Sequence, residues 1–359
     1  MNKIDQFLQD ALAKSSSDLH FISGDPPRIR VHGSLTTLTK EVLTITFVRE
    51  AVYEIMSGAL QLEFEKNGSV DFAYEIPEVS RFRVNIMRHL KGIGAVMRAI
   101  PTTALALEEL DMPEVVHNFC KQSQGLILVT GKTGSGKSTT LAAMIDAINN
   151  QMKGHILTIE DPVEFVHQRK SCLISQREIG LHSDSFADAL HSAMREDPDV
   201  VLVGELRDLE TISIAITAAE MGILVMGTLH TNGAAQTVDR MVNTFPADKQ
   251  DQIRNMLSTS LRGVISQQLL PLKDKPGRVA ALEILVNTPG VGNLIRKGKL
   301  DQLETAMQSG GAIGMQTMDS TLMDLVERNV ISGQEAYQQA NNKARFKSVS
   351  DKPDDPLDP

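Results

Sequence analysis

The feature that most constrains the fold of this chain is a glycine-rich turn between an apolar run and a helical pattern. In "GLILVTGKTGSGKSTTLAAMI", glycines, a lysine and a serine are spaced as G-x-x-x-x-G-K-S. Such glycines let backbone N–H groups surround a phosphate, while the lysine reaches the outer phosphates and the hydroxyl binds Mg²⁺. The pattern therefore predicts a strand, a loop that binds a nucleoside triphosphate, and a helix. The predicted nucleotide-binding residues are Gly131, Lys132, Thr133, Gly134, Ser135, Gly136, Lys137, Ser138 and Thr139.

Residues 114–345 alternate short apolar runs with helical stretches. The runs are "GLILVT", "HILTIE", "VVLVGE" and "ILVMGTLH". Continuous apolar runs separated by helices are typical of a parallel sheet that is covered on both faces. We expect a long helix over residues 248–269, then a hairpin of "LLPL" with "RVAALEILV", and small helices to about residue 343. The predicted fold class is α/β.

Residues 1–100 follow a different pattern. Helical spacing covers residues 4–12, 46–56 and 58–66, and a hairpin is expected around His32. The later strands alternate apolar and polar residues, which is typical of an antiparallel sheet with one buried face. This part of the chain is therefore predicted to be a smaller α+β domain.

Two segments are predicted to lie outside the domains. Residues 101–113 stand between two prolines and are interpreted as a linker. Residues 346–359 are rich in proline and acids and nearly without apolar residues, so we expect a disordered acidic tail.

The composition excludes several classes of protein. A net charge of -9 argues against a general nucleic-acid binder. Cys120 and Cys172 are isolated, so neither a disulfide framework nor a cysteine zinc site is expected. No run approaches the roughly 18 apolar residues of a membrane span. We expect a cytoplasmic protein that binds no nucleic acid and contacts a membrane only through partners.

Acidic side chains follow two of the apolar runs. "TIEDPVEF" contains Glu160, Asp161 and Glu164, and "VVLVGELRD" contains Glu205 and Asp208. In a parallel sheet the carboxyl ends of the strands face the ligand crevice, so these acids are expected near the phosphate-binding loop. Hydrolysis needs one carboxylate to orient water and another acid to support Mg²⁺. Because no N-K-x-D motif for guanine follows the phosphate-binding loop, we expect ATP to be the nucleotide.

Four segments, "GKTGSGKSTT", "TIEDPVEF", "DPDVVLVGELRD" and "GTLHTN", follow one another in the chain. In order and spacing they resemble the Walker A, Asp box, Walker B and His box of the type II and type IV secretion ATPases. Within that superfamily, residues 1 to about 345 are similar to the type IV pilus retraction ATPases. The resemblance implies a homohexameric, Mg²⁺-dependent ATPase with a PAS-like N-terminal domain and a RecA-like C-terminal domain. It also implies a cytoplasmic motor that acts on an inner-membrane platform protein to withdraw pilin subunits.

The same resemblance implies roles for individual residues. Ser138 and Glu205 are the expected Mg²⁺ ligands, and Glu164 is the residue expected to polarise water. His230, at the end of "GTLHTN", is expected to sense the γ-phosphate. Glu160 is a second candidate for polarising water or supporting Mg²⁺, so the choice of base among the acids stays open.

One departure from the retraction family concerns its signature A-I-R-N-L-I-R-E, which appears as "GVGNLIRK" at residues 290–297. Gly292 replaces an arginine and Lys297 replaces an acid. An accessory or divergent paralogue, working beside a paralogous pilus ATPase, is therefore an alternative. The absence of a C-x-x-C zinc element favours retraction over extension. A hexameric DNA translocase or helicase, which DNA would stimulate, and a regulatory P-loop protein without turnover are further alternatives.

The segment "RFRVN" places Arg81 and Arg83 on one face of a strand and Phe82 and Val84 on the other. A solvated polar face is one interpretation. The resemblance offers another, because in this family the N-terminal domain of one subunit packs against the ATPase domain of the next. Arg81 or Arg83, with Arg98, would then stabilise charge on the γ-phosphate of a neighbouring subunit.

Overall fold

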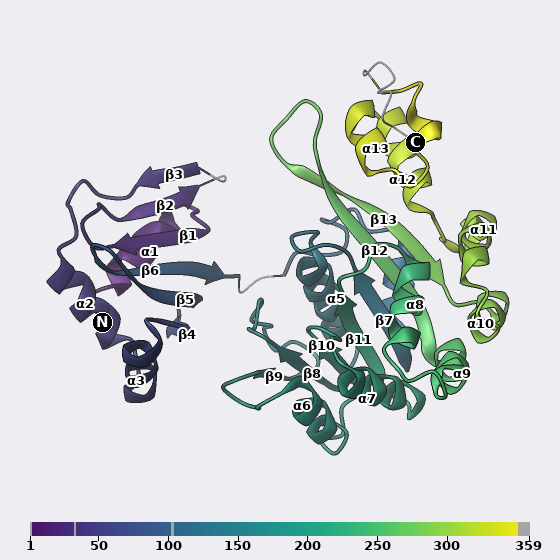
Figure 1. Ribbon diagram of the computed structural model, residues 1–359, viewed down its shortest axis with the longest axis horizontal. Helices are drawn as coiled ribbons and strands as arrows, with labels where there is room; N and C mark the ends of the chain where they lie inside the picture. Colours follow the sequence, from purple (N-terminus) through teal and green to yellow (C-terminus); the bar gives the residue numbers. More distant parts are fainter. Residues whose placement is uncertain (1, 32–33, 102–103, 351–359) are drawn as a thin grey trace. The chain divides into compact units, whose positions relative to one another are not determined.

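The computed structural model describes residues 2–31, 34–101 and 104–350. Its chain divides into two compact units. The N-terminal unit comprises Met1–Thr103 and Pro162–Val166, and the C-terminal unit comprises Ala104–Asp161 and His167–Pro359. Each unit has its own sheet and its own hydrophobic core (Figure 1).

The N-terminal unit is a six-stranded antiparallel sheet with helices packed on one face. The strand order is β3-β2-β1-β6-β5-β4. Its strands are β1 (Asp18–Ile22), β2 (Arg28–Val31), β3 (Ser34–Thr37), β4 (Ser69–Ile76), β5 (Ser80–His89) and β6 (Gly92–Ile100), and its helices are α1 (Asp5–Ala13), α2 (Ile45–Glu54) and α3 (Gly58–Asn67). These bounds agree closely with the predicted helices and strands. The expected hairpin joins β2 to β3, and His32 and Gly33 at its turn lie outside the described residues.

Strand β5 shows the predicted alternation most clearly. Phe82, Val84 and Ile86 are buried in the core with residues of all three helices, while Arg83 is exposed. Because successive side chains of a strand point to opposite faces, one face of the sheet is covered by the helices and the other carries the polar residues.

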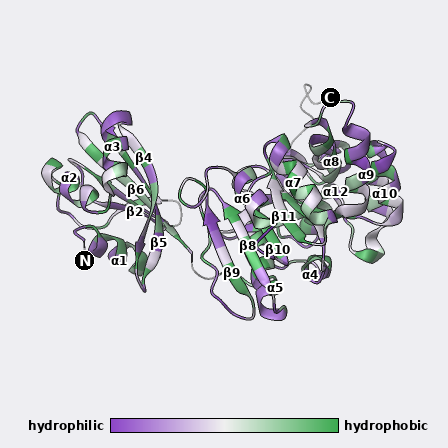
Figure 2. Cartoon of the chain, turned by 90° about the horizontal axis from the view of Figure 1, so that it is seen from below, coloured by the Kyte–Doolittle hydropathy of each residue, from purple (hydrophilic) through white to green (hydrophobic). Residues whose placement is uncertain are grey.

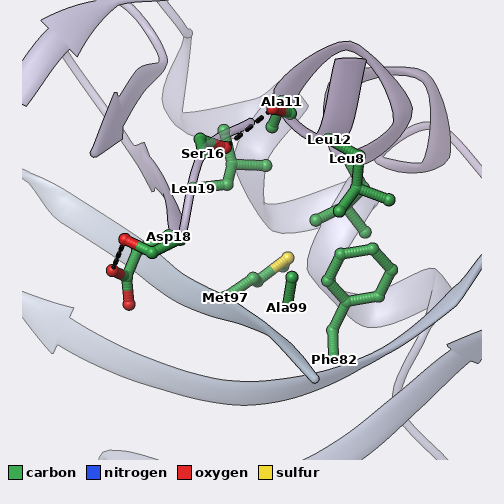
Figure 3. A pocket seen from close by; sticks show the side chains of 10 residues that line it. Leu8, Ala11, Leu12, Ser16, Asp18, Leu19, Phe82, Met97 and Ala99 are labelled. Atoms are coloured by element: carbon green, nitrogen blue, oxygen red, sulfur yellow. Dashed lines mark hydrogen bonds between the residues drawn. The ribbon is translucent and has the colours of Figure 1, made fainter. Parts of the chain in front are cut away.

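A small cavity remains beneath α1 in this core (Figure 3). Leu8 of α1 and Phe82 of β5 line it, together with Met97 of β6. At its rim the Ser16 hydroxyl donates a hydrogen bond of 2.8 Å to the Ala11 carbonyl. With a volume of about 10 Å³ the cavity has room for one water molecule at most.

The C-terminal unit is built on a seven-stranded sheet of order β13-β12-β7-β11-β10-β8-β9. Its strands are β7 (Gly125–Thr130), β8 (His155–Glu160), β9 (Leu173–Glu178), β10 (Val200–Val203), β11 (Leu224–Leu229), β12 (Leu261–Pro271) and β13 (Arg278–Val286). All neighbours pair in parallel except β12 and β13. The inner strands β8, β10 and β11 are mostly hydrophobic and the edge strand β9 is more polar (Figure 2). The predicted α/β class is thus what the structure shows.

Helices cover both faces of this sheet, where two separate clusters of apolar residues form. The helices are α4 (Glu114–Cys120), α5 (Lys137–Gln151), α6 (Phe186–Ala193), α7 (Leu209–Glu220), α8 (Ala234–Asn243), α9 (Gln250–Ser260), α10 (Pro289–Arg296), α11 (Leu303–Ser309), α12 (Met318–Glu327) and α13 (Gly333–Gln339), with short 3-10 turns at Leu300–Gln302, Gly311–Ile313 and Lys343–Phe346. A third cluster joins α12 and α13 to the outer part of the β12-β13 hairpin (Figure 1).

The long helix predicted over residues 248–269 is wrong in its second half. Helix α9 ends at Ser260, and Leu261 opens strand β12, which pairs in parallel with β7. The apolar spacing continues from Ile253 through Leu257 to Leu261, so the pattern alone favours a longer helix. Pairing with a buried strand overrides that local preference.

The segments predicted to be a linker and a tail are more structured than expected. Leu107 and Met112 are buried in a core cluster of the C-terminal unit, so residues 104–112 pack onto that unit. Phe346 is also fully buried, and backbone hydrogen bonds continue to Ser350. Residues 102–103 and 351–359 lie outside the described part of the chain.

Both cysteines are free and buried. Burial raises the pKa of the Cys120 thiol to about 12, so it stays protonated and unreactive at neutral pH. Among the described residues, no helix has both the length and the apolar character needed to cross a membrane.

Candidate nucleotide-binding and catalytic site

The loop between β7 and α5 needs glycine at its two ends. Gly131 has a φ of +141° and Gly136 a φ of +91°, values that other residues rarely adopt. A Cβ at Gly131 would lie 2.3 Å from the Gln267 carbonyl oxygen, and one at Gly136 would lie 2.6 Å from the Gln267 Nε2. The loop therefore folds closely against β12, with its backbone free to approach a ligand.

Lys137, the first residue of α5, places its ammonium inside this loop. The side chain is 8 % exposed, and its Nζ donates hydrogen bonds to the carbonyls of Gly131 at 2.9 Å and Lys132 at 3.1 Å. The Ser135 hydroxyl is buried and has no hydrogen-bond partner in the described structure. A buried ammonium, a hydroxyl without a partner and the start of a helix fit an anion such as a triphosphate.

Gln267 of β12 packs against the phosphate-binding loop and bonds to α5. This role was not predicted from the sequence. It is 2 % exposed, and its Oε1 accepts a hydrogen bond of 2.8 Å from the Thr140 hydroxyl of α5. The polar residues Ser266, Gln267 and Gln268 between the apolar residues of "GVISQQLL" are a signal that sequence reasoning passed over.

Backbone hydrogen bonds bring the ends of four strands to one edge of the sheet. Gly204, after β10, donates to the carbonyl of Ile159 in β8 at 2.7 Å. Leu206 donates to Thr228 in β11 at 2.9 Å, and Gly131 donates to Leu229 at 3.4 Å. The segments that carry Glu160, Glu205, His230 and the phosphate-binding loop are thus neighbours in this order.

Glu205 lies between two basic side chains. Arg207 Nε donates to its Oε1 at 2.7 Å, and His230 Nε2 lies 3.3 Å from its Oε2. Burial by itself raises the pKa of Glu205, but Arg207 and His230 outweigh this effect and hold the pKa below its ordinary value of 4.5. The carboxylate is therefore ionised at neutral pH.

Arg207 was not predicted, although its position two residues after Glu205 on an extended segment is a usable signal. Side chains at such positions lie on the same side of the backbone. The neighbouring acid Asp208 has another part in the structure, because it caps α7 by accepting the Thr211 N–H at 2.8 Å.

The three acids of "TIEDPVEF" are placed differently. Glu160 is buried, and its Oε1 accepts hydrogen bonds from the Thr158 hydroxyl at 2.7 Å and the Gln176 amide at 3.3 Å. Asp161 is exposed at the end of the strand. Glu164 is exposed and belongs to residues 162–166 of the N-terminal unit, where the Val166 N–H donates to the Pro101 carbonyl at 3.2 Å. The C-terminal unit therefore brings Glu160, but not Glu164, to the strand ends.

Hydrogen bonds between hydroxyls and the backbone fix the loop after β11 at the start of α8. The hydroxyls of Thr231 and Thr237 are 2.8 Å apart, and the Thr237 hydroxyl donates to the Gly233 carbonyl at 2.7 Å. His230 at the start of the loop remains partly exposed beside Glu205.

The arginines of β5 belong to the N-terminal unit. Arg81 is opposite Glu75 of β4, whereas Arg83 is directly opposite Arg98 of β6. Arg98 is neutralised by Asp18, with 2.8 Å between its Nε and the carboxylate. Arg83 is exposed and forms no ion pair within the described ranges. Like charges directly opposite one another destabilise a sheet, so Arg83 is not explained by the stability of this sheet.

The predicted donor set for Mg²⁺ consists of one hydroxyl and one carboxylate. In the part of the chain that is described, no cluster of three or more His, Cys, Asp and Glu side chains is able to hold a metal ion. Mg²⁺ bound with a nucleotide keeps several waters and takes only one or two protein ligands. Ser138 at the start of α5 and Glu205 are oxygen donors of the kind that it prefers.

The chain is similar to several known proteins. The chain is 49% identical over 343 residues to the type IV pilus retraction ATPase PilT of Pseudomonas aeruginosa, covering 96% of this chain and 99% of that protein. It is 50% identical over 333 residues to the twitching motility protein of Neisseria gonorrhoeae, covering 91% and 89%. A crystal structure of the pilus retraction motor PilT with bound ADP matches with a TM-score of 0.90 and 41% identity, covering 96% and 99%.

These relatives confirm the predicted family and the predicted enzyme class, an ATPase. Residues 1–350 also match the family described as type II/IV secretion system protein. From its matched residues and its relatives, the chain belongs to the type II/IV secretion system protein family.

Proposed function

We propose that this chain is a Mg²⁺-dependent ATPase that powers the retraction of type IV pili. The observation that carries the proposal is its 49% identity to PilT over nearly the whole length of both chains, with the P-loop and the strand-end acids in place. The identity to the type IV pilus ATPase PilU of Pseudomonas aeruginosa is lower, at 38% over 340 residues. The proposed protein works as a homohexamer at the inner face of the cytoplasmic membrane, bound to an inner-membrane platform protein.

Each residue of the site has a part in the proposed mechanism. Lys137 and the backbone N–H groups of the loop bind the phosphates of ATP, and the Ser135 hydroxyl donates to one of them. Ser138 and Glu205 would hold Mg²⁺, which would supply positive charge next to the phosphates. His230, fixed by Glu205, contacts the γ-phosphate and reports whether it is present.

A carboxylate must orient the attacking water, and we propose Glu164 for this part. The support for this choice is the resemblance of "TIEDPVEF" to the Asp box of the secretion ATPases, which makes Glu164 the expected acid. Glu160, which accepts hydrogen bonds from Thr158 and Gln176, is the second candidate.

The accessory role remains a second proposal because of helix α10. Gly292 is buried there, and a Cβ at this position would lie 2.8 Å from the Ser258 carbonyl oxygen of α9. The arginine of the family signature does not fit without a shift of one helix. The departure is therefore part of how α10 packs against α9.

Deletion of the gene in the source organism tests the direction of the motor. We expect excess surface pili and loss of surface motility, because assembly continues while withdrawal stops. Pili are counted by electron microscopy, and a plasmid-borne copy should restore the normal number. Loss of pili after deletion would assign the chain to extension instead. Turnover of the purified protein that requires DNA would favour the translocase alternative.

The second expectation concerns the arginines of β5. A ring of Arg81→Ala/Arg83→Ala subunits is expected to hydrolyse ATP poorly, because cations that neutralise the γ-phosphate are lost. Mixing these subunits with Lys137→Ala subunits should restore part of the turnover if the arginines act on a neighbouring subunit. Turnover is measured by phosphate release after the two proteins are exchanged into common rings.

Arg88→Ala is the matched control for this experiment. Arg88 is on the same strand and is paired with Glu65, so its loss is expected to leave turnover unchanged. Mixed rings that form but stay inactive would favour the solvated-face interpretation of Arg81 and Arg83.

A further inference from the structure

A row of buried polar side chains crosses three strands of the C-terminal sheet. Ser266 of β12 is in register with Thr130 of β7 and with Glu283 of β13. All three side chains are less than about a tenth exposed: Thr130 is 0 %, Ser266 2 % and Glu283 5 % exposed. Buried polar groups need hydrogen-bond partners, so we looked for the groups that bond to these three side chains.

The partners of the row lie at the start of α8, just after the loop that carries His230. The Gly233 N–H donates to the Ser266 hydroxyl at 2.8 Å, and the Ala234 N–H donates to Glu283 Oε1 at 2.7 Å. The Thr237 hydroxyl is 3.5 Å from that of Thr130. Gly233 has a φ of +101°, and a Cβ there would lie 3.1 Å from Glu283 Oε1. The carboxylate therefore sets where the loop ends.

The second oxygen of Glu283 has a different partner. It accepts the N–H of Met318, the first residue of α12, at 3.3 Å. Helix α12 is part of the cluster that also contains Leu270 and Phe346. One carboxylate is thus shared between the loop beside Glu205 and the C-terminal helices.

We propose that Glu283 is a positioning residue for ATP hydrolysis, holding the loop of His230 in register with Glu205 and linking that loop to α12. The inference rests on the proposed function as an ATPase and goes beyond the four motifs. A movement of the C-terminal helices, produced by load or by a partner, would reach His230 through this carboxylate. Among the described residues, Glu283 forms no hydrogen bond with His230 or Glu205.

Glu283→Gln is the variant that tests this role. A glutamine keeps the size of the side chain and one acceptor oxygen, but its NH₂ group faces a backbone N–H and loses one of the two links. We expect kcat to fall about tenfold, as for other residues that orient catalytic groups, with KM for ATP unchanged because the phosphate-binding loop is intact. Burial raises the pKa of Glu283, so a neutral amide relieves a buried charge and the fold should tolerate it.

Asp319→Asn is the matched control. Asp319 is 2 % exposed and accepts the backbone N–H groups of Asn341 at 2.8 Å and Asn342 at 2.9 Å. It is thus a buried carboxylate of α12 with two backbone donors, and within the described residues it forms no hydrogen bond with α8. We expect its Tm to fall as much as that of Glu283→Gln while kcat stays within about twofold of wild type.

The readouts separate positioning from simple stabilisation. A loss of kcat in Glu283→Gln alone, at equal Tm, supports the proposal. An equal loss of kcat in both variants, or no loss in either, overturns it. Wild-type protein is assayed in parallel, because absence of wild-type turnover would instead overturn the proposed ATPase function and this inference with it.

Discussion

Replacing Lys137 with alanine is expected to reduce ATP turnover at least about 10³-fold, with the fold retained. The ammonium lies inside the phosphate-binding loop, where it donates to the carbonyls of Gly131 and Lys132. A buried cation at this position is worth far more to a phosphate than one in water, because little solvent screens it. Phosphate release at saturating ATP measures the loss, and circular dichroism with thermal melting checks the fold.

Lys121→Ala serves as the control for the loss of a positive charge. Lys121 follows α4 and forms a surface ion pair with Glu114, so we expect unchanged turnover and little change in stability. Turnover retained in a folded Lys137→Ala protein would remove the loop from the catalytic site.

Glu205→Gln is expected to bind ATP nearly as tightly as wild type and to hydrolyse it about 10²–10⁴-fold more slowly. The glutamine keeps the volume of the side chain but removes the negative charge that Arg207 and His230 share. Binding is retained because the phosphate-binding loop, which makes the main contacts with the nucleotide in the proposed mechanism, is unchanged. Equilibrium binding of a fluorescent nucleotide and single-turnover hydrolysis measure the two effects separately.

Glu164→Ala is also expected to bind ATP and to hydrolyse it slowly. Normal turnover in Glu205→Gln or in Glu164→Ala would remove the substituted residue from the mechanism. Asp208→Asn is the matched control within the segment "VGELRD". Because asparagine caps a helix about as well as aspartate, this variant should keep both Tm and turnover close to wild type.

The phosphate-binding loop was predictable because its determinants are local. Positive φ angles at Gly131 and Gly136 and the absence of room for a Cβ require glycine at fixed spacing from Lys137. The alternation in β5 was equally readable, since a strand with one buried face must place Phe82 and Val84 on the side opposite Arg83.

Interactions between distant segments were not predictable in the same way. Gln267 was missed although it supports the loop from more than a hundred positions along the chain. It belongs to none of the four motifs. Its importance depends on which strands become neighbours, and β12 lies beside β7 only because the sheet is assembled in that order.

The error over residues 248–269 has the same origin. The spacing of Ile253, Leu257 and Leu261 suits a helix, and only pairing with β7 turns the chain into a strand after Ser260. Likewise, the linker prediction failed at Leu107 and Met112 because isolated apolar residues reveal nothing about a core that other segments build.

By itself, the sequence determined the nucleotide loop, the α/β class and the acids that follow the strands, because glycine conformation and residue periodicity act over a few neighbouring positions. The tertiary structure decided which charges meet. It placed Glu205 between Arg207 and His230, grouped Glu164 with the N-terminal unit, and shared the carboxylate of Glu283 between α8 and α12. Hydrogen bonds and ion pairs need contact at about 3 Å, and contacts of this range between distant segments exist only once the sheet has formed.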